Sequence, residues 1–585
     1  MIRIFRYFKK REWIFAVICI VLVVIQVWFD LRLPDYMSEI TTLVQTAGSS
    51  MNDIVIAGCF MLACALGSLL TAMIVGYFSS QIAASLAMRL REMVYDKTLS
   101  FSMEEMNGFS TDSLITRSTN DITQIQTLVA MGLQAVVKAP ILAVWAIVKI
   151  AGKNFLFTMA TGVAVVFLIG MLFIILFLAV PKSKMIQQLT DNLNLVTREH
   201  LTGIRVVRAY NAENYQEKKF EKANEELTSA NLFVNKITAI ISPSMTFISS
   251  ALTLAIYWIG TYLINQSAPQ EKLPIFSDMV VFSSYAMQVI MAFMMLTMIF
   301  IMLPRAVVSA KRILEVLDTK EKILDGTVTE TNGKLSGHVE FKNVTFSYPG
   351  AVESVLENIS FTVNKGETVA FIGSTGSGKS TLINLIPRFY DCTEGEILVD
   401  GINVKNYTQA SLRNRIGYIS QKAVIFSGSI LSNVVYGDNG KEKQESDVIE
   451  KAVSIAQAAD FVEKYGLNSA VSQGGTNLSG GQKQRLSIAR AIYRQPEIFI
   501  FDDSFSALDY RTDKVLRNEL SKQTKDATKL IVAQRIGTIK DADRIIVLDE
   551  GKMVGSGTHM ELLKSCAVYK EIALSQLSKE ELEYA

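Results

Sequence analysis

A glycine-rich loop between an apolar strand and an apolar helix carries the clearest chemistry in the sequence. Thr368–Ile372 reads as a buried strand, Gly373–Thr381 has the pattern GxxxxGK[ST], and Leu382–Ile386 opens a helix. Glycines let backbone N–H groups face phosphate oxygens, and the helix N-terminus adds positive potential. Lys379 is expected to reach the outer phosphates and Ser380 to bind magnesium. The residues expected to hold the phosphates are Gly373, Ser374, Thr375, Gly376, Ser377, Gly378, Lys379, Ser380 and Thr381.

A second apolar strand ends in two carboxylates. Ile498–Phe501 contains only isoleucine and phenylalanine, and Asp502 and Asp503 follow it. In P-loop enzymes a carboxylate at such a strand end helps to hold Mg²⁺, and an unpaired carboxylate there would be costly to bury. Asp502 is therefore expected to complete the magnesium site with Ser380.

The elements that must position these residues form only the second half of the chain. The chain has 585 residues, 50% of them hydrophobic, and a mean hydropathy of +0.28, which is too long for one domain and too apolar for an ordinary soluble protein. Long apolar runs fill the first half, whereas those after about residue 327 are short. The net charge of +2 provides no field that would attract nucleic acid, so that class of partner is excluded.

Six apolar runs approach or exceed the roughly 20 helical residues that a bilayer core requires. The predicted spans are residues 13–33, 53–78, 131–150, 155–180, 237–264 and 278–303. Lys and Arg concentrate at the N-terminus and in the connections after spans two and four, so both termini are expected in the cytoplasm. Those two connections have helical spacing and are expected to be helices that leave the bilayer and return, with flexible charged linkers as the alternative. The predicted division is a transmembrane domain over 1–310, a linker over 311–337 and a nucleotide-binding domain over 338–585.

Several side chains of the predicted spans are candidates for a pocket. One stripe of span six carries Met287, Met291, Met294, Met298 and Met302. Flexible thioethers suit a surface that accepts ligands of several shapes, although ordinary helix packing would produce the same stripe. Lys138 and Gln288 are candidate polar groups of that pocket, and snorkelling of Lys138 to the interface is the alternative.

The pentad Leu478–Gln482 reads LSGGQ, and with it the chain resembles the ABC transporter family. The resemblance extends over essentially the whole chain, because six spans followed by one nucleotide-binding domain is the layout of half-transporter exporters. It implies an all-α membrane domain with long cytoplasmic helical extensions, followed by an α/β P-loop domain with a helical subdomain. It also implies that each bound ATP lies between two subunits, so that a dimer is required.

The resemblance assigns roles to further residues. Tyr348 is expected to stack on adenine, and Gln421 to sense the γ-phosphate and contact Mg²⁺. The segment 506–509, which includes Asp509, looks like the loop that crosses between subunits. Segments 103–109 and 209–216 look like the coupling helices that press on nucleotide-binding domains. The residues expected to close over the partner's ATP are Ser479, Gly480, Gly481 and Gln482.

Two positions depart from the family pattern. Hydrolytic members carry Glu after the Asp502 position and His at the end of a later strand, but this chain has Asp503 and Gln534. Aspartate withdraws the carboxylate by one methylene, and glutamine cannot carry positive charge. The combination resembles the degenerate-site subunit of heterodimeric bacterial multidrug exporters in the cytoplasmic membrane. Such a subunit would use ATP and Mg²⁺ with a second half-transporter to export small amphipathic compounds; a homodimeric lipid or peptide exporter and an ATP-gated regulatory membrane protein are the alternatives.

Overall fold

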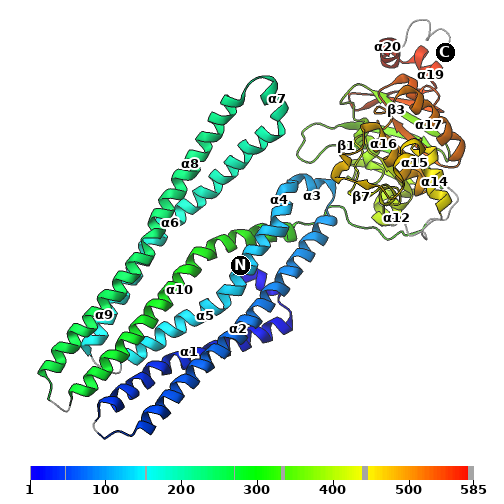
Figure 1. The fold of residues 1–585 in the computed structure, drawn as a ribbon. Coiled ribbons are helices and arrows are strands. Elements are labelled where there is room, and N and C mark those ends of the chain that lie inside the picture. The colour runs from blue at the N-terminus through cyan, green and yellow to red at the C-terminus, as the bar shows by residue number, and fades with distance from the viewer. Residues whose placement is uncertain are drawn as a thin grey trace. The chain divides into compact units, whose positions relative to one another are not determined.

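The computed structural model describes residues 2–46, 48–151, 155–268, 271–330, 336–437 and 446–576. The chain forms two compact units. One consists of Met1–Leu99 with Ser110–Thr319, and the other of Ser100–Phe109 with Lys320–Ala585. The first is all-α and the second is α/β, so the expected fold class is confirmed (Figure 1).

The first unit contains, among its described residues, six helical segments that are long and apolar enough to cross a membrane, which confirms the predicted number. Helices α2 and α6 have 49 and 48 residues, so each spans about 70 Å at ~1.5 Å per residue, more than twice a bilayer core. Both therefore continue beyond the membrane, and the predicted helical connections are confirmed. The helices of this unit are η1 (Ile2–Tyr7), α1 (Lys10–Gln45), α2 (Met51–Leu99), α4 (Thr111–Thr116), the π-helical turn η2 (Arg117–Asp121), α5 (Ile122–Ala151), α6 (Phe155–Thr202), α7 (Ile204–Ala209), α8 (Glu213–Ala239), α9 (Ile241–Gln266) and α10 (Lys272–Asp318).

Small residues set the packing of this bundle. Ala139, Ala143 and Ala146 of α5 are buried at i, i+4 and i+7 in the same apolar cluster as Val281 and Ala292 of α10, and α5 packs against α10. Small side chains let helices approach closely where lipid supplies no hydrophobic drive for association. Helices α1 and α2 form a hairpin that also packs against α5 and α10, and α6 pairs with α8 (Figure 1). Helix α10 continues to Asp318, beyond the end of the apolar run that marks its span in the sequence.

The second unit is built around two sheets. The strands of the larger sheet lie in the order β12-β11-β3-β10-β9-β6, with every described pairing parallel except that of β12, and the smaller antiparallel sheet has the order β2-β1-β4-β5. The strands are β1 (Val339–Phe346), β2 (Leu356–Val363), β3 (Thr368–Gly373), β4 (Glu394–Val399), β5 (Ile402–Asn403), β6 (Ile416–Ile419), β7 (Gly428–Ser429), β8 (Ala470–Val471), β9 (Ile498–Asp502), β10 (Thr528–Val532), β11 (Arg544–Asp549) and β12 (Lys552–Gly557). The helices are α3 (Met103–Gly108), α11 (Lys379–Leu385), η3 (Val404–Asn406), α12 (Gln409–Asn414), α13 (Ile430–Val434), α14 (Ser446–Ile455), α15 (Ala459–Tyr465), η4 (Gln473–Gly475), α16 (Gly480–Tyr493), α17 (Tyr510–Gln523), α18 (Ile536–Ile539), α19 (His559–Ser565) and α20 (Ala567–Gln576).

The parallel register brings the chemical residues to one edge of the larger sheet. Val532 of β10 lies beside both Phe371 of β3 and Asp502 of β9, and Phe501 of β9 lies beside Ile419 of β6. All four strands therefore end at nearly the same level, and the loops that follow them converge.

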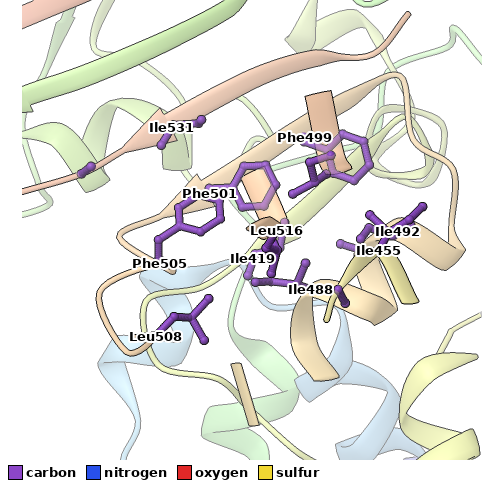
Figure 2. Close-up of a cluster of buried hydrophobic side chains, with 14 of the residues drawn as sticks. Ile419, Ile455, Ile488, Ile492, Phe499, Phe501, Phe505, Leu508, Leu516 and Ile531 are labelled. Atoms are coloured by element: carbon purple, nitrogen blue, oxygen red, sulfur yellow. The ribbon is translucent and has the colours of Figure 1, made fainter. Parts of the chain in front are cut away.

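An aromatic cluster supports the loop that leaves β9. Phe499, Phe501 and Phe505 are each no more than 3% exposed, and the rings of Phe501 and Phe505 lie 4.9 Å apart. Figure 2 shows these rings with Leu516 and Ile488 from the neighbouring helices. Because the side chain of Phe505 is anchored in this core, the backbone of residues 502–505 is held against the sheet.

A short segment after α10 is held to the rest of the second unit by hydrogen bonds. The N–H groups of Gly326 and Val328 donate to the carbonyls of Tyr407 and Asn406, each at 2.9 Å. The Arg388 guanidinium donates to the carbonyl of Leu324. A Cβ at residue 326 would lie 2.1 Å from the Asn406 carbonyl oxygen, so this close approach requires glycine. These residues lie within the segment expected to be a linker, and the structure shows them in regular contact with the domain that follows.

Candidate functional site

The loop between β3 and α11 folds around its own lysine. Lys379 Nζ donates to the carbonyls of Gly373 and Ser374 at 2.9 and 2.6 Å and to Ser377 Oγ at 3.2 Å. Burial lowers the pKa of Lys379, while the nearby carboxylates of Asp503 and Asp502 oppose that shift. The ammonium is therefore held at the base of the loop, where it can reach a phosphate.

The expected magnesium residues meet across two strands. Ser380 Oγ donates to Asp502 Oδ1 at 2.7 Å, and the Tyr418 hydroxyl lies 3.5 Å from Asp502 Oδ2. Burial raises the pKa of Asp502, and the bonds from Ser380 and Tyr418 and the charge of Lys379 oppose that rise. A hydroxyl and a carboxylate are ligands that Mg²⁺ prefers, so these residues fit that ion.

Asp503 follows the end of β9, and side chains that follow the ends of two neighbouring strands bond to it. Gln421 after β6 donates from Nε2 to Asp503 Oδ2 at 3.3 Å, and Gln534 after β10 donates to the same oxygen at 3.1 Å. Burial is the main cause that raises the pKa of Asp503, and the bond from Gln421 opposes it. Asp503 is 9% exposed and has a left-handed φ of 46°. One carboxylate oxygen is thus held by two neutral amides, neither of which can take up a proton.

The LSGGQ pentad forms the start of helix α16. Ser479 is its N-cap: its hydroxyl accepts from the Gln482 N–H at 3.2 Å, and Gln482 Oε1 accepts from the Ser479 N–H at 2.9 Å. Ser479 and Gly480 are exposed, and a Cβ at Gly480 would meet nothing within 4 Å. The reciprocal cap stiffens an open turn that a phosphate can approach.

The other residues implied by the resemblance lie in two further places. The Tyr348 hydroxyl lies 3.0 Å from Thr381 Oγ1 at the end of the phosphate loop. Asp509 is the exposed N-cap of α17, and the hydrogen bond from the Thr512 N–H is the main cause that lowers its pKa. Of the two expected coupling segments, 103–109 contains α3 in the second unit, whereas 209–216 lies at the turn between α7 and α8 in the first.

A charged pair within the membrane bundle involves a residue that the sequence patterns did not single out. Lys138 Nζ lies 2.9 Å from Asp30 Oδ2, and Ser68 Oγ donates to Asp30 Oδ1 at 2.5 Å. Pro34 has no N–H for the carbonyl of Asp30, one turn earlier in α1, and Gln288 Nε2 donates to that carbonyl at 2.9 Å. Lys138 thus pairs within the bundle. In the sequence, an aspartate four residues before a proline in span one was the signal that could have pointed to Asp30.

The methionine stripe of α10 is exposed along much of one face. Met287, Met291, Met294 and Met298 are between 43% and 52% exposed in the single chain. Met287 Sδ accepts a hydrogen bond from Ser249 of α9 at 3.6 Å.

Comparison with known proteins identifies both halves of the chain. The family model for the ABC transporter transmembrane region matches residues 16–313, and the ABC transporter model matches residues 356–506. An uncharacterized ABC transporter ATP-binding protein of Mycobacterium tuberculosis is 40% identical over 88% of this chain and 86% of its own length. The uncharacterized ABC transporter ATP-binding protein YfiB of Bacillus subtilis is 34% identical over 89% and 90%.

Two further matches extend the likeness to exporters. An ATP-dependent lipid A-core flippase of Pseudomonas fluorescens is 32% identical over 85% of this chain and 81% of its own length. The structure of a bacterial Atm1-family ABC exporter with ATP bound has the same fold, with a TM-score of 0.82, 24% identity and coverage of 97% of this chain and all of that one. The chain therefore belongs to the ABC transporters, as a multi-pass half-transporter of the exporter type whose ATP-hydrolysing domain lies in the cytoplasm.

Proposed function

We propose that this chain is the degenerate-site subunit of a heterodimeric exporter of amphipathic compounds. The observation that carries the proposal is the arrangement around Asp503, whose carboxylate is short, buried and held by Gln421 and Gln534. A general base must reach the nucleophile with a free lone pair, and two amides already bond to one of the two oxygens of this short carboxylate. ATP at this loop is then bound but hydrolysed slowly.

The same chain keeps what a partner's site requires. The Ser479–Gln482 turn is complete and capped, and its Ser479 and Gly480 are exposed, so it can close over ATP on a second half-transporter. That partner supplies the Glu and the His that this chain lacks. On the nucleotide held by this chain, the phosphate loop, Tyr348, Asp509 and the Mg²⁺ residues Ser380, Asp502 and Gln421 bind without fast turnover. The division into 1–310, 311–337 and 338–585 is part of this proposal.

The exposed methionines of α10 support the proposal that the cargo is an amphipathic compound. Exposed thioethers on α10 form an apolar and adaptable surface that suits amphipathic molecules of several shapes. Similarity to lipid A-core flippases favours a second candidate, a homodimeric lipid exporter. Transport assays in vesicles with labelled lipid and with labelled amphipathic drugs separate the two.

Turnover tests the asymmetric assembly directly. The full chain is purified alone and with a candidate partner half-transporter that carries the Glu and the His, and phosphate release is measured in nanodiscs. We expect little ATPase activity from the chain alone and strong, vanadate-sensitive activity from the pair. Brisk hydrolysis by the chain alone, abolished by Asp503→Asn, would overturn the proposal. Vanadate-sensitive transport by the pair would exclude a purely regulatory role.

A further inference from the structure

Three aromatic rings adjoin the adenine side of the phosphate loop. Tyr348, Phe346 and Tyr390 lie with centroids 5.0 to 5.6 Å apart. The Tyr348 and Tyr390 rings are perpendicular at 5.3 Å, an edge-to-face pair. The Tyr348 hydroxyl is hydrogen-bonded to the Thr381 hydroxyl. A base that stacks on Tyr348 must therefore either keep this geometry or move Tyr390 with it, because close-packed rings cannot shift independently.

The far end of Tyr390 contacts the short helix α3. Asn107 Nδ2 donates to the Tyr390 hydroxyl at 3.2 Å. Burial is the main cause that raises the pKa of Tyr390 above its usual 10.0, so the phenol stays neutral and can accept this bond at physiological pH. The bond is specific to the hydroxyl, and phenylalanine at position 390 would keep the ring while losing it.

Helix α3 is itself fixed to the segment that follows α10. Glu105 accepts from the Lys322 N–H at 3.0 Å, and Glu104 forms an ion pair with the Lys322 ammonium. Ser102 and Glu105 form a reciprocal N-terminal cap on the helix. The helix is therefore attached within this unit both to Lys322 and to Tyr390.

We propose that Tyr390 is a positioning residue that links adenine binding at Tyr348 to the placement of α3 through Asn107. The path runs from the base to the Tyr348 ring, to the Tyr390 ring, and through one hydrogen bond to α3. It is separate from Gln421 and Asp503, so it operates even where hydrolysis is slow. This inference rests on the assignment of Tyr348 to adenine under the proposed function.

Coupling of this kind is reciprocal, because a residue that transmits binding to α3 must also transmit the state of α3 to binding. One edge-to-face pair and one neutral hydrogen bond each correspond to a ~2- to 10-fold change in an equilibrium constant. Loss of the Tyr390 hydroxyl, which accepts the bond from Asn107, should therefore weaken ATP binding by that factor.

The test uses the full chain in nanodiscs with a spin label at Met103→Cys, in a background that carries Cys59→Ser. Affinity for a fluorescent ATP analogue and the nucleotide-induced change in label mobility are both measured. We expect Tyr390→Phe and Asn107→Ala each to lower affinity by ~2- to 10-fold and to reduce the mobility change. The double variant should be no worse than the more affected single variant, because both remove the same bond.

Control variants separate the possible failures. Tyr436→Phe, on an exposed ring of the same unit, should change neither readout. Lys322→Ala removes the ion pair to Glu104 but keeps the backbone bond to Glu105, so it should loosen the label and, because the coupling is reciprocal, weaken nucleotide binding no more than Tyr390→Phe does. If Tyr348→Ala leaves affinity unchanged, the assignment of Tyr348 fails. If Tyr348→Ala weakens binding but Tyr390→Phe alters neither readout, or if the Tyr390 and Asn107 effects are additive, the link through Tyr390 is wrong.

Discussion

The side-chain amide of Gln534 donates a 3.1 Å hydrogen bond to the carboxylate of Asp503. These are the two positions at which the chain departs from the hydrolytic pattern of its family, and they contact each other. The departures therefore form one altered arrangement, in which the residue that replaces the histidine donates to one carboxylate oxygen of the residue that replaces the glutamate.

The first prediction follows from this contact. The double variant Asp503→Glu with Gln534→His should raise hydrolysis at this chain's site by ~10-fold or more, because a positioned general base contributes ~10²–10⁴ in rate. Either single variant should show a smaller rise in the rate of hydrolysis, since one of the two positions would still carry the residue that departs from the hydrolytic pattern. Phosphate release is measured in the assembled transporter with the partner's catalytic carboxylate neutralised. Asp526→Glu on an exposed turn is the control, and an inactive double variant would contradict the prediction.

A second prediction concerns the cap of α16. Ser479→Ala and Thr558→Ala each remove the N-cap of a reciprocal capping box, and each should cost ~1 kcal/mol of stability. Only Ser479→Ala should abolish the ATPase activity of the assembled transporter, because that hydroxyl belongs to the turn that closes over the partner's ATP. Thermal unfolding and phosphate release are compared for both. Equal losses of activity would show that Ser479 acts only as a cap.

The membrane pair supplies a third prediction. Lys138→Met should destabilise the transmembrane unit by up to ~3–5 kcal/mol, the loss for a fully buried pair, because it leaves the half-buried Asp30 without its counter-charge. Adding Asp30→Asn should restore much of that loss. Unfolding in detergent is the measurement. Lys219→Met, which breaks an exposed pair with Glu199, should change stability by less than ~1 kcal/mol. A Lys138 variant as stable as the control would indicate that the pair is solvated.

A fourth prediction concerns pH and the docking of α3. Burial would raise the pKa of Glu105, but hydrogen bonds from Ser102 and the Lys322 N–H outweigh it and leave the pKa below 4.5. The ionised carboxylate therefore stabilises the docked helix above pH 4.5, and this contribution is lost as the pH falls through the lowered pKa.

Glu105→Gln isolates that charge, because glutamine can still complete the cap. Hydrogen exchange of the α3 amides should be faster in this variant at neutral pH, and its acid dependence should be weaker. Glu463→Gln, at an exposed position of α15, should behave as the native chain does. An unchanged acid profile in Glu105→Gln would assign the pH dependence to another group.

Local patterns were sufficient for the parts of the site that lie close together in sequence. The phosphate loop, the strand before Asp502 and the LSGGQ turn are each contiguous, and hydropathy alone indicates six spans. The meeting of Gln421, Asp503 and Gln534 depends on the strand order β6-β9-β10, and apolar runs do not encode strand order. Likewise, Lys138 signalled a polar site, but its pairing with Asp30 depends on how distant helices pack.

The segment after α10 shows a second limit of local patterns. Its Asp, Gly and Thr residues have the composition of a loop, and the last turns of α10 are too polar to continue an apolar run. Helicity there extends to Asp318, and Gly326 permits a close backbone approach to Asn406. A glycine in a polar segment marks a flexible turn and a tight contact equally well, so composition could not distinguish them.

The Asp30–Lys138 pair also bears on how the protein is made. Ribosomes add ~5–20 residues per second, so Lys138 emerges several seconds after Asp30 because roughly a hundred residues separate them. During that interval α1 must enter the lipid with its carboxylate lacking a counter-ion. Ser68, in the very next helix, donates to Asp30, so α1 and α2 can insert as a hairpin that shelters the acid until α5 arrives. The hairpin of α1 and α2 therefore contains a polar partner for Asp30 before α5 is made.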